Sequence, residues 1–482
     1  MKILVMLIAI GLFSCSKDEV IADPVIYVQS ITIGGSNITS GTATQMTATI
    51  LPANANNKAI AWSVSDVSVA TISSSGLITA KKNGNVLVTA TAVDKNSITA
   101  SKEITITSFN VGNENTIEVS NATQLLDALL KVKAGSTIIL TQGTYALNSK
   151  ITIGISGTAQ DKITLKGKEG QNRPKLDFSS MVENSANQGI VLTADYWHIK
   201  GIDIYKAGDN GMQIKGHHNL IEFCTFSECA DTGLQIDNGA SNNTILNCDS
   251  YFNADSTMEN ADGFACKLNA GTGNKFIGCR AWQNLDDGWD GYLRGTDNIT
   301  TTYENCWAIK NGYLKNGTKG SGDGNGFKTG GSDDKLLKHH AIYKNCIAVG
   351  NVVDGFDHNS NRGNVTIYNC AAYDNGKNYS FSNTNPLEKL TIKNSSALGA
   401  FGSITAAILD VTHNSWQNGI SVSAADFESI DYNQLIGPRK ADGSLPDVSF
   451  FRLKAGSGLI DKGINVGLPF NGSAPDLGAF EF

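Results

Sequence analysis

The chain has 482 residues and a formal net charge of −7, with 38 Lys and Arg against 45 Asp and Glu. This length suffices for one large domain and one small domain. The negative balance excludes a basic surface for nucleic acid, so an anionic partner has to be bound by a local cationic site or by a metal ion. Glycine is abundant (50), proline is scarce (8), and no long amphipathic helical pattern follows the N-terminus. This composition predicts an all-β protein with short strands and tight turns.

The first residues have the pattern of a targeting segment. Lys2 precedes an apolar run from Ile3 to Phe13, which is too short to span a bilayer. Ser14 and Cys15 follow, and this arrangement resembles a bacterial lipobox. The resemblance implies a signal peptide over residues 1–15, lipidation of Cys15 and a protein held at the outer membrane or cell surface. The alternative is an ordinary cleaved signal peptide and a secreted protein.

Residues 28–108 alternate apolar and polar side chains in short runs. These runs predict half-buried strands at residues 31–33, 46–50, 61–64, 86–90 and 104–106. About 80 residues with six or seven strands indicate an Ig-like β-sandwich. At Trp62-Ser63 and Gly76–Ala80 the segment resembles the bacterial Ig-like domain of group 2. It contains no His and no Cys, and we expect it to be a spacer.

A second unit is expected over residues 116–482. Residues 122–132 carry apolar side chains at helical spacing, and a predicted strand at 136–140 and a Gly143-Thr144-Tyr145 turn follow. This order resembles the entry to a right-handed parallel β-helix, in which the helix covers the open end of the core.

An internal repeat supports a solenoid. Five residues after each of six cysteines stands an Asn or, once, a Cys, and a Gly followed by a large apolar residue recurs between them. The pairs are Cys224 and Cys229, Cys248 and Asn253, Cys279 and Asn284, Cys306 and Asn311, Cys346 and Asn351, and Cys370 and Asn375. Variable periods with fixed local spacing indicate rungs with loop insertions. We interpret the cysteines as small buried packing residues rather than disulfides or zinc ligands, and the asparagines as a hydrogen-bonded column.

Alignment of the repeats on their Gly residues brings acidic residues together. The residue before Gly is Asp262 and then Asp287 in consecutive repeats, and the residue two after Gly is Asp290 and then Lys328. Since neighbouring rungs lie about 4.8 Å apart, Asp262 should lie beside Asp287, and Asp290 beside Lys328. With Asp286, four carboxylates then converge on two rungs.

Such a cluster repels itself unless it is neutralised. Calcium is the natural solution, since it takes six to eight oxygen ligands. A solvated acidic patch with Lys328 as counter-ion is the alternative.

The stretches Asn260–Ala265, Asn284–Asp290 and Gly324–Lys328 resemble the active-site motifs of polysaccharide lyase family 9, and Gly355–Asn359 and Pro475–Glu481 fit as well. The similarity spans residues 116–482. It implies a right-handed parallel β-helix and β-elimination on galacturonate-containing chains of pectin. It also implies calcium ligands at Asp262, Asp286, Asp287 and Asp290, and a catalytic base at Lys328.

These residue types suit that chemistry. Calcium on the substrate carboxylate would stabilise charge as the proton at carbon 5 is removed, and a lysine base acts best at alkaline pH. We expect an alkaline optimum and a loss of activity with a chelator.

Other residues are weaker candidates for the site. Asp357, His358, Arg362, Arg294 and Lys267 are candidates for binding the anionic polymer. Trp282 and Tyr292 are candidate sugar platforms, with a role in packing as the equal alternative for each, whereas the pair His339-His340 is expected at the surface of an insertion.

Several functions remain open from the sequence. The first is a monomeric pectate lyase acting on polygalacturonate, and the second is a lyase for rhamnogalacturonan I. A non-catalytic surface protein that binds glycans is a third, although it would have no need of Lys328. A glycoside hydrolase is the fourth, and it would need an acid and a base carboxylate at a defined separation.

Overall fold

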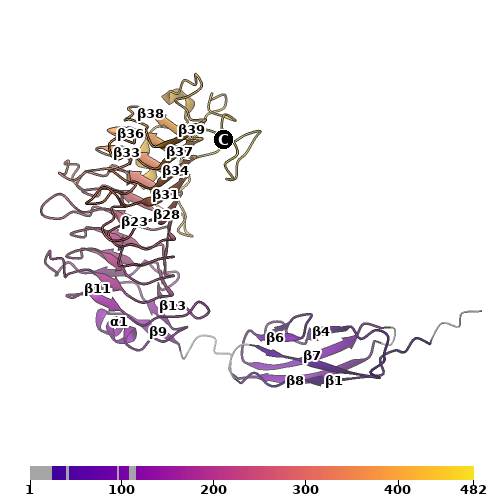
Figure 1. Cartoon of the computed structure of the whole chain (residues 1–482). Helices are drawn as coiled ribbons and strands as arrows, with labels where there is room; N and C mark the ends of the chain where they lie inside the picture. Colours follow the sequence, from indigo (N-terminus) through magenta and orange to yellow (C-terminus); the bar gives the residue numbers. More distant parts are fainter. Residues whose placement is uncertain (1–23, 40–42, 95–96, 108–114) are drawn as a thin grey trace, which may run out of the picture. The chain divides into compact units, whose positions relative to one another are not determined.

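A computed structural model describes residues 24–39, 43–94, 97–107 and 115–482, so the targeting segment and Cys15 lie outside the described residues. The chain forms two compact units, residues 1–114 and 115–482 (Figure 1). Among the residues that the structure describes, no helix is long and apolar enough to cross a membrane.

The N-terminal unit is built from antiparallel strands, as the alternating pattern predicts. The strand pairs and triplets are β1–β3, β2–β6–β5 and β4–β7–β8. Val86, Val88 and Ile104 point inward from β7 and β8 and are at most 1% exposed. The strands are β1 (Ser30–Gly34), β2 (Ala43–Gln45), β3 (Thr47–Leu51), β4 (Ile60–Val64), β5 (Ala70–Ile72), β6 (Leu77–Ala80), β7 (Gly84–Ala92) and β8 (Thr99–Ile106).

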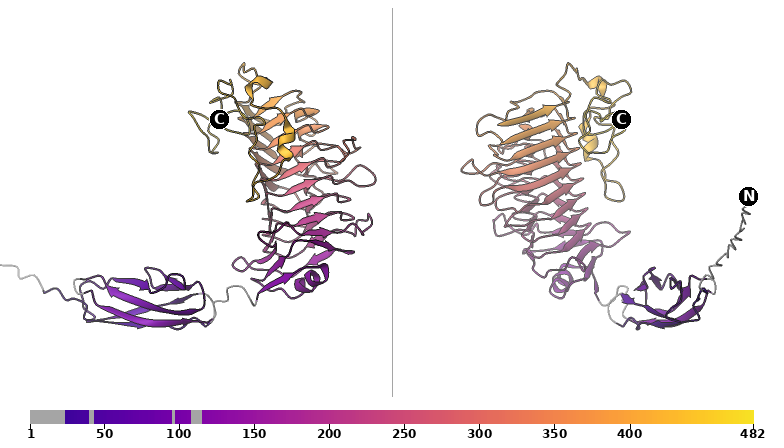
Figure 2. Two further views of the ribbon diagram at one scale, coloured as in Figure 1. Left: turned by 180° about the vertical axis from the view of Figure 1, so that it is seen from behind. Right: turned by 45° about the vertical axis from the view of Figure 1, so that its right-hand side comes forward.

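The C-terminal unit is a parallel β-helix, in which successive coils add one strand to each of three parallel sheets (Figures 1 and 2). The 12-stranded sheet contains β9 (Thr116–Val119), β10 (Thr137–Leu140), β13 (Ile163–Gly167), β16 (Trp197–Lys200), β19 (Leu220–Glu222), β22 (Thr244–Leu246), β25 (Asn274–Ile277), β28 (Ile299–Glu304), β31 (His339–Lys344), β34 (Asn364–Tyr368), β37 (Lys389–Lys393) and β39 (Ile408–Thr412). The 10-stranded sheet contains β11 (Thr144–Ala146), β14 (Lys175–Asp177), β17 (Asp203–Tyr205), β20 (Thr225–Ser227), β23 (Asp249–Tyr251), β26 (Arg280–Trp282), β29 (Trp307–Ile309), β32 (Ile347–Val349), β35 (Ala371–Tyr373) and β38 (Ser396–Leu398). The nine-stranded sheet contains β12 (Ile151–Ile153), β15 (Ile190–Leu192), β18 (Met212–Ile214), β21 (Leu234–Ile236), β24 (Phe264–Cys266), β27 (Trp289–Asp290), β30 (Phe327–Lys328), β33 (Asp354–Asp357) and β36 (Lys377–Ser380).

Three columns of repeated side chains hold the coils in register. The six repeat cysteines are free and fully buried, which confirms their role in packing. The asparagines form a ladder in which Nδ2 of one residue donates to Oδ1 of the next, at 2.8 Å from Asn253 to Asn284 and 3.0 Å from Asn284 to Asn311. A third column, inside the nine-stranded sheet, is aromatic, and its rings stack 4.8 Å apart at Trp289 and Phe327. Because each column repeats once per rung, a shift in register would break every contact in it.

The helix that covers the first rungs is α1 (Ala122–Leu129), three residues shorter than predicted. Asn121 caps it, with its side chain accepting from the backbone N–H of Gln124. Leu125, Ala128 and Leu129 are buried in the same core cluster as the first strands. The helix therefore closes the end of the hydrophobic core, as expected.

The C-terminal segment runs back along the outside of the 10-stranded sheet, where its aromatic and aliphatic residues cover Trp307, Ile309 and Ile347 (Figure 2). It includes the short 3-10 helices η1 (Ala424–Asp426) and η2 (Tyr432–Ile436). A buried cluster of ion pairs attaches the C-terminal segment to the β-helix. Asp249 accepts from Arg280 Nε and Nη2 at 2.8 Å and from Arg439 Nη2 at 2.7 Å.

Candidate active site

The outer face of the nine-stranded sheet carries the predicted column of charged residues. Parallel pairing places Ala265 beside Asp290, Asp290 beside Lys328, and Lys328 beside Asp357. The preceding residue of each strand points inward into the aromatic stack, because side chains alternate along a strand. The predicted neighbourhood of Asp290 and Lys328 is thus confirmed.

A glycine turn before each strand places the remaining carboxylates. A Cβ on Gly263 would lie 2.7 Å from the Cβ of Ala281 and 2.8 Å from the carbonyl oxygen of Gly288. No other residue permits so close an approach of neighbouring rungs. The turn therefore fixes Asp262 beside the next rung, where the backbone N–H of Asp287 donates to its Oδ1 at 3.2 Å.

Asp262, Asp286 and Asp287 form a buried carboxylate cluster. One oxygen of each lies within 4.8 Å of the others, and the three residues are 0%, 7% and 0% exposed. Backbone N–H groups hold the side chains in place: Asn325 donates to Asp287 Oδ1 at 2.8 Å, and Asp323 donates to Asp286 Oδ1. Backbone N–H groups of neighbouring rungs thus hold Asp262 and Asp287, and an inserted loop holds Asp286.

Two lysines face this cluster. Lys328 Nζ lies 2.9 Å from Asp323 Oδ2, 3.2 Å from Asp287 Oδ2 and 3.9 Å from Asp290 Oδ1. Lys267 Nζ lies 2.7 Å from Asp262 Oδ2 and 3.4 Å from Asp290 Oδ2. Both ammonium groups thus contact Asp290, while Lys267 also contacts Asp262 and Lys328 also contacts Asp287. Lys328 is only 7% exposed.

The pKa values of these aspartates and of Lys328 are shifted because the charged groups lie close together and are buried. Burial raises the pKa of Asp286 to about 7, and burial followed by the charge of Asp286 raises the pKa of Asp287 well above its usual range. Burial alone would raise the pKa of Asp290, but Lys328 and Lys267 outweigh it and lower that pKa. Burial disfavours the charged form of Lys328, yet the surrounding carboxylates prevail and raise its pKa. The two lysines do not neutralise all four aspartates.

The donor set fits a hard divalent cation. Asp287 Oδ2 is buried and accepts no hydrogen bond, since its contact with Lys328 is an ion pair without hydrogen-bond alignment. Asp262, Asp286, Asp287 and Asp290 offer only oxygen atoms, the ligands that calcium prefers. A buried carboxylate oxygen that accepts no hydrogen bond is costly unless a ligand satisfies it.

A polar groove of about 600 Å³ runs over this site along successive rungs. Its lining contains Asp286, Asp290 and Lys328, and it continues past Lys267 to residues of earlier rungs, where it ends at Ser185. A groove that follows the stack over several rungs suits an extended polymer better than a small compact ligand.

Two of the five candidates for substrate binding line the groove, and the other three, Asp357, His358 and Arg362, are not among its lining residues. Lys267 and Arg294 line the groove, but Lys267 is bound to Asp262, and Arg294 pairs with Asp333 at 3.4 Å. Asp357 lies next to Lys328 in the register, and burial with Asp354 raises its pKa to about 7. The His358 ring forms a hydrogen bond through Nε2 with the carbonyl oxygen of Asn385 at 2.8 Å.

The structure favours packing over sugar binding for Trp282, and it contradicts the expected surface position of His339. Trp282 is 9% exposed and stacks on Tyr251 at 4.3 Å, under the C-terminal segment, so it is a packing residue. His339 is buried rather than at the surface, with Nδ1 2.7 Å from the carbonyl oxygen of Gly291 and Nε2 2.8 Å from Thr301 Oγ1. Tyr292, in contrast, lines the groove.

Asp323 is a site residue that the sequence reasoning missed. It comes from an inserted loop between two rungs and provides the shortest contact of Lys328, at 2.9 Å. The repeat alignment contains no position for it, so only its closeness in sequence to Asn325 and Lys328 signalled it.

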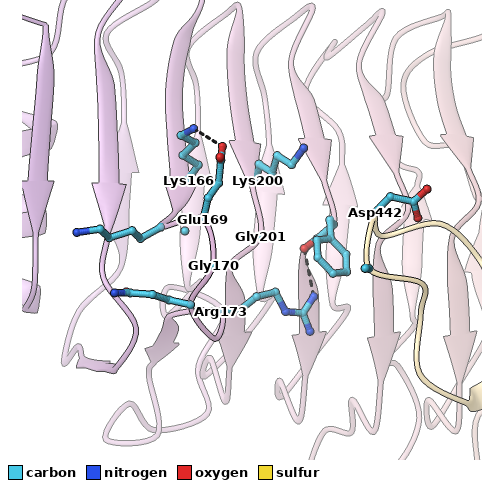
Figure 3. A pocket seen from close by; sticks show the side chains of 12 residues that line it. Lys166, Glu169, Gly170, Arg173, Lys200, Gly201 and Asp442 are labelled. Carbon is cyan, nitrogen blue, oxygen red and sulfur yellow. Dashed lines mark hydrogen bonds and ion pairs between the residues drawn. The ribbon is translucent and has the colours of Figure 1, made fainter. Parts of the chain in front are cut away.

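A second hollow, of about 280 Å³, lies against the 12-stranded sheet and is rich in basic residues (Figure 3). Its cations are already paired. Lys166 lies 2.9 Å from Glu169, Lys200 lies 2.7 Å from Glu222, and Arg173 lies 3.0 Å from Asp203. This hollow therefore presents little free positive charge to an anionic polymer.

Comparison with known proteins agrees with this geometry. Residues 105–395 match the model of the "Pel9A-like, right handed beta helix region", and residues 28–104 match the bacterial Ig-like domain of group 2. The chain belongs to the Pel9A-like right-handed β-helix family and is a polysaccharide lyase.

Individual relatives are similar over most of the larger unit. Pectate lyase L of Dickeya dadantii is 40% identical over 73% of this chain and 84% of its own length, and pectate lyase L of Paenibacillus polymyxa is 39% identical over 70% and 78%. The solved pectate lyase Pel9A has a TM-score of 0.69 at 36% identity and covers 77% of this chain and 97% of its own. A solved rhamnogalacturonan lyase has a TM-score of 0.64 at 26% identity over 70% and 97%.

Proposed function

We propose that the protein is a calcium-dependent pectate lyase that cleaves polygalacturonate by β-elimination. The observation that carries this proposal is the position of Lys328 on the rung next to Asp290, beside the buried carboxylate cluster and in the groove that Asp286 and Asp290 also line. The names of the similar pectate lyases support polygalacturonate as the substrate.

Lys328 is the proposed base. Its Nζ takes the proton from carbon 5 of a galacturonate unit, the electron pair forms the double bond between carbons 4 and 5, and the bond from carbon 4 to the glycosidic oxygen breaks. The leaving oxygen then takes a proton from solvent water, and the lysine returns its own proton to solvent. The base must be a neutral amine, and the carboxylates that raise the pKa of Lys328 oppose this. Activity should therefore rise with pH above neutrality.

Asp262, Asp286, Asp287 and Asp290 would hold calcium in this account. When bound there, calcium neutralises the carboxylates and withdraws charge from the substrate carboxylate. The aspartates themselves are held by backbone N–H groups of neighbouring rungs. This preorganisation reduces the reorganisation that the site would otherwise need at the moment of reaction.

The test follows the ultraviolet absorbance of the unsaturated product with polygalacturonate and, separately, with rhamnogalacturonan I, each with calcium and with a chelator. We expect a calcium-dependent rise in absorbance that is larger with polygalacturonate than with rhamnogalacturonan I. A larger rise on rhamnogalacturonan I would move the specificity to the second substrate. New reducing ends without added absorbance would show hydrolysis instead.

We also propose that Cys15 anchors the protein to the outer membrane by a lipid, with the Ig-like unit as a spacer. A Cys15→Ser variant should then be found in the soluble fraction of the producing cells. Retention of that variant in the membrane fraction would contradict the anchor.

A further inference from the structure

We propose a second divalent-cation site in the same groove, formed by Asp209, Asn210 and Asp231, which binds a carboxylate of the polymer away from the cleavage point. The part of the proposal that concerns the polymer rests on the proposed function, whereas the cation site itself stands on the geometry below.

The two carboxylates occupy equivalent positions on neighbouring rungs. Each stands two residues before the glycine of its turn, and the strands that follow pair Met212 with Leu234. Asp209 and Asp231 interact electrostatically with each other, and both line the groove with Asn210. Two like charges held on adjacent rungs repel each other unless a cation lies between them.

Local partners leave the site short of positive charge. Gln188 Nε2 donates to Asp209 Oδ2 at 2.8 Å, and the backbone N–H of Thr232 donates to Asp231 Oδ1 at 2.7 Å, but these donors are neutral. Lys267, the cation that acts on Asp231, is itself bound to Asp262 at 2.7 Å.

An independent observation points to a ligand at this place. Asn210 is only 4% exposed, and its Oδ1 has no hydrogen-bond partner, whereas its Nδ2 donates to Asp209 Oδ2 at 3.1 Å. A buried amide oxygen without a partner is costly, and a cation would satisfy it. Two carboxylates and an amide carbonyl form a donor set made of oxygen atoms alone, which favours calcium over softer metals.

The position of this set gives it a role on the polymer. The middle of this set lies about two rungs, or about 10 Å, from the middle of the cluster of Asp262, Asp286 and Asp287 along the stack, and Asp231 is on the rung next to that of Asp262. A polyuronate carries one carboxylate on every sugar, so a chain lying in the groove presents a second carboxylate there. Water molecules and that carboxylate would complete the coordination of the ion. The site would therefore contribute to substrate binding rather than to proton abstraction.

The experiment counts bound calcium by calorimetry in the full chain with Lys328→Ala, which keeps an oligogalacturonate intact. Titrations are made with and without the oligosaccharide. Addition of Asp209→Asn and Asp231→Asn should remove one bound calcium in at least one of the two conditions. Asp333→Asn, the loss of an exposed acid that pairs with Arg294, should remove none. If the chains with and without these two substitutions bind the same number of calcium ions in both conditions, the proposal is overturned.

A kinetic measurement in the chain with the native Lys328 separates binding from chemistry. The double variant should raise KM for polygalacturonate by about tenfold, which corresponds to the loss of one moderate contact, and leave kcat within about twofold. Asn210→Asp, which adds a charged oxygen ligand, should tighten calcium binding at this site. A fall in kcat at unchanged KM would contradict the assigned role. If the native chain forms no unsaturated product at all, the proposed function fails, and the calcium count still decides the cation site.

Discussion

Asp286→Asn should stabilise the calcium-free protein above neutral pH while weakening its response to calcium. Burial, with the charge of Asp262, raises the pKa of Asp286 from 3.8 to about 7. The folded state therefore holds this proton more tightly than the unfolded state, so stability is lost as pH rises from about 4 to about 7 and stays lost above that range. A shift of about three units corresponds to about 4 kcal/mol. Asn removes the charge and keeps an oxygen that accepts from the backbone N–H of Asp323.

Urea unfolding in a chelator, at about pH 5 and about pH 8, measures this effect. The advantage of the variant over the native chain should grow by a few kcal/mol between the two pH values. Saturating calcium should stabilise the native chain by about 3 kcal/mol at a hundred times the dissociation constant, and it should stabilise the variant by less. Asp333→Asn, an exposed acid in which 68% of the side chain is accessible, is the matched control and should show neither effect. The same pH dependence for Asp286→Asn and the native chain in chelator would refute the electrostatic reasoning.

Three further predictions concern the scaffold. Asn311→Ala removes one member of the ladder and its bond to Asn351 at 3.0 Å, and should cost about 1–3 kcal/mol in urea unfolding; no loss would show that the ladder is dispensable. Asp249→Asn leaves two buried arginines without their carboxylate, should cost about 3–5 kcal/mol, and should release the C-terminal segment to proteolysis; unchanged resistance would contradict the proposed fastening. Burial lowers the pKa of His339 to about 4, so the stability that this histidine contributes should fall as pH drops from about 6.5 to about 4. His339→Gln should flatten that part of the profile, and an unaltered profile would assign the acid sensitivity to other groups.

The sequence predicts the parts of the site that the repeat itself positions. The fixed spacing around Gly263, Gly288 and Gly326 implies that Asp290 and Lys328 are neighbours, because strands in a parallel stack pair in register. The same alignment explains the asparagine ladder and the cysteine column.

Contacts between distant segments and inserted loops could not be predicted in this way. Asp323 reaches Lys328 from a loop whose path no periodicity determines. Arg439 reaches Asp249 across 190 residues of sequence, and the C-terminal segment that carries it buries Trp282, which the local sequence presents as accessible. His339 appears polar and exposed in the sequence, yet its ring is buried and forms a hydrogen bond with the carbonyl oxygen of Gly291.

The assignment of Lys328 as the base is tested most directly by the initial rate of unsaturated product formation from polygalacturonate by Lys328→Ala in saturating calcium, across neutral to alkaline pH. We expect a loss of at least about a hundredfold, the usual contribution of a general base, with calcium binding retained. We also expect that Lys338→Ala, the loss of an exposed lysine paired with Glu388, leaves the rate unchanged. A Lys328→Ala rate close to that of the native chain would contradict the assignment of Lys328 as the base.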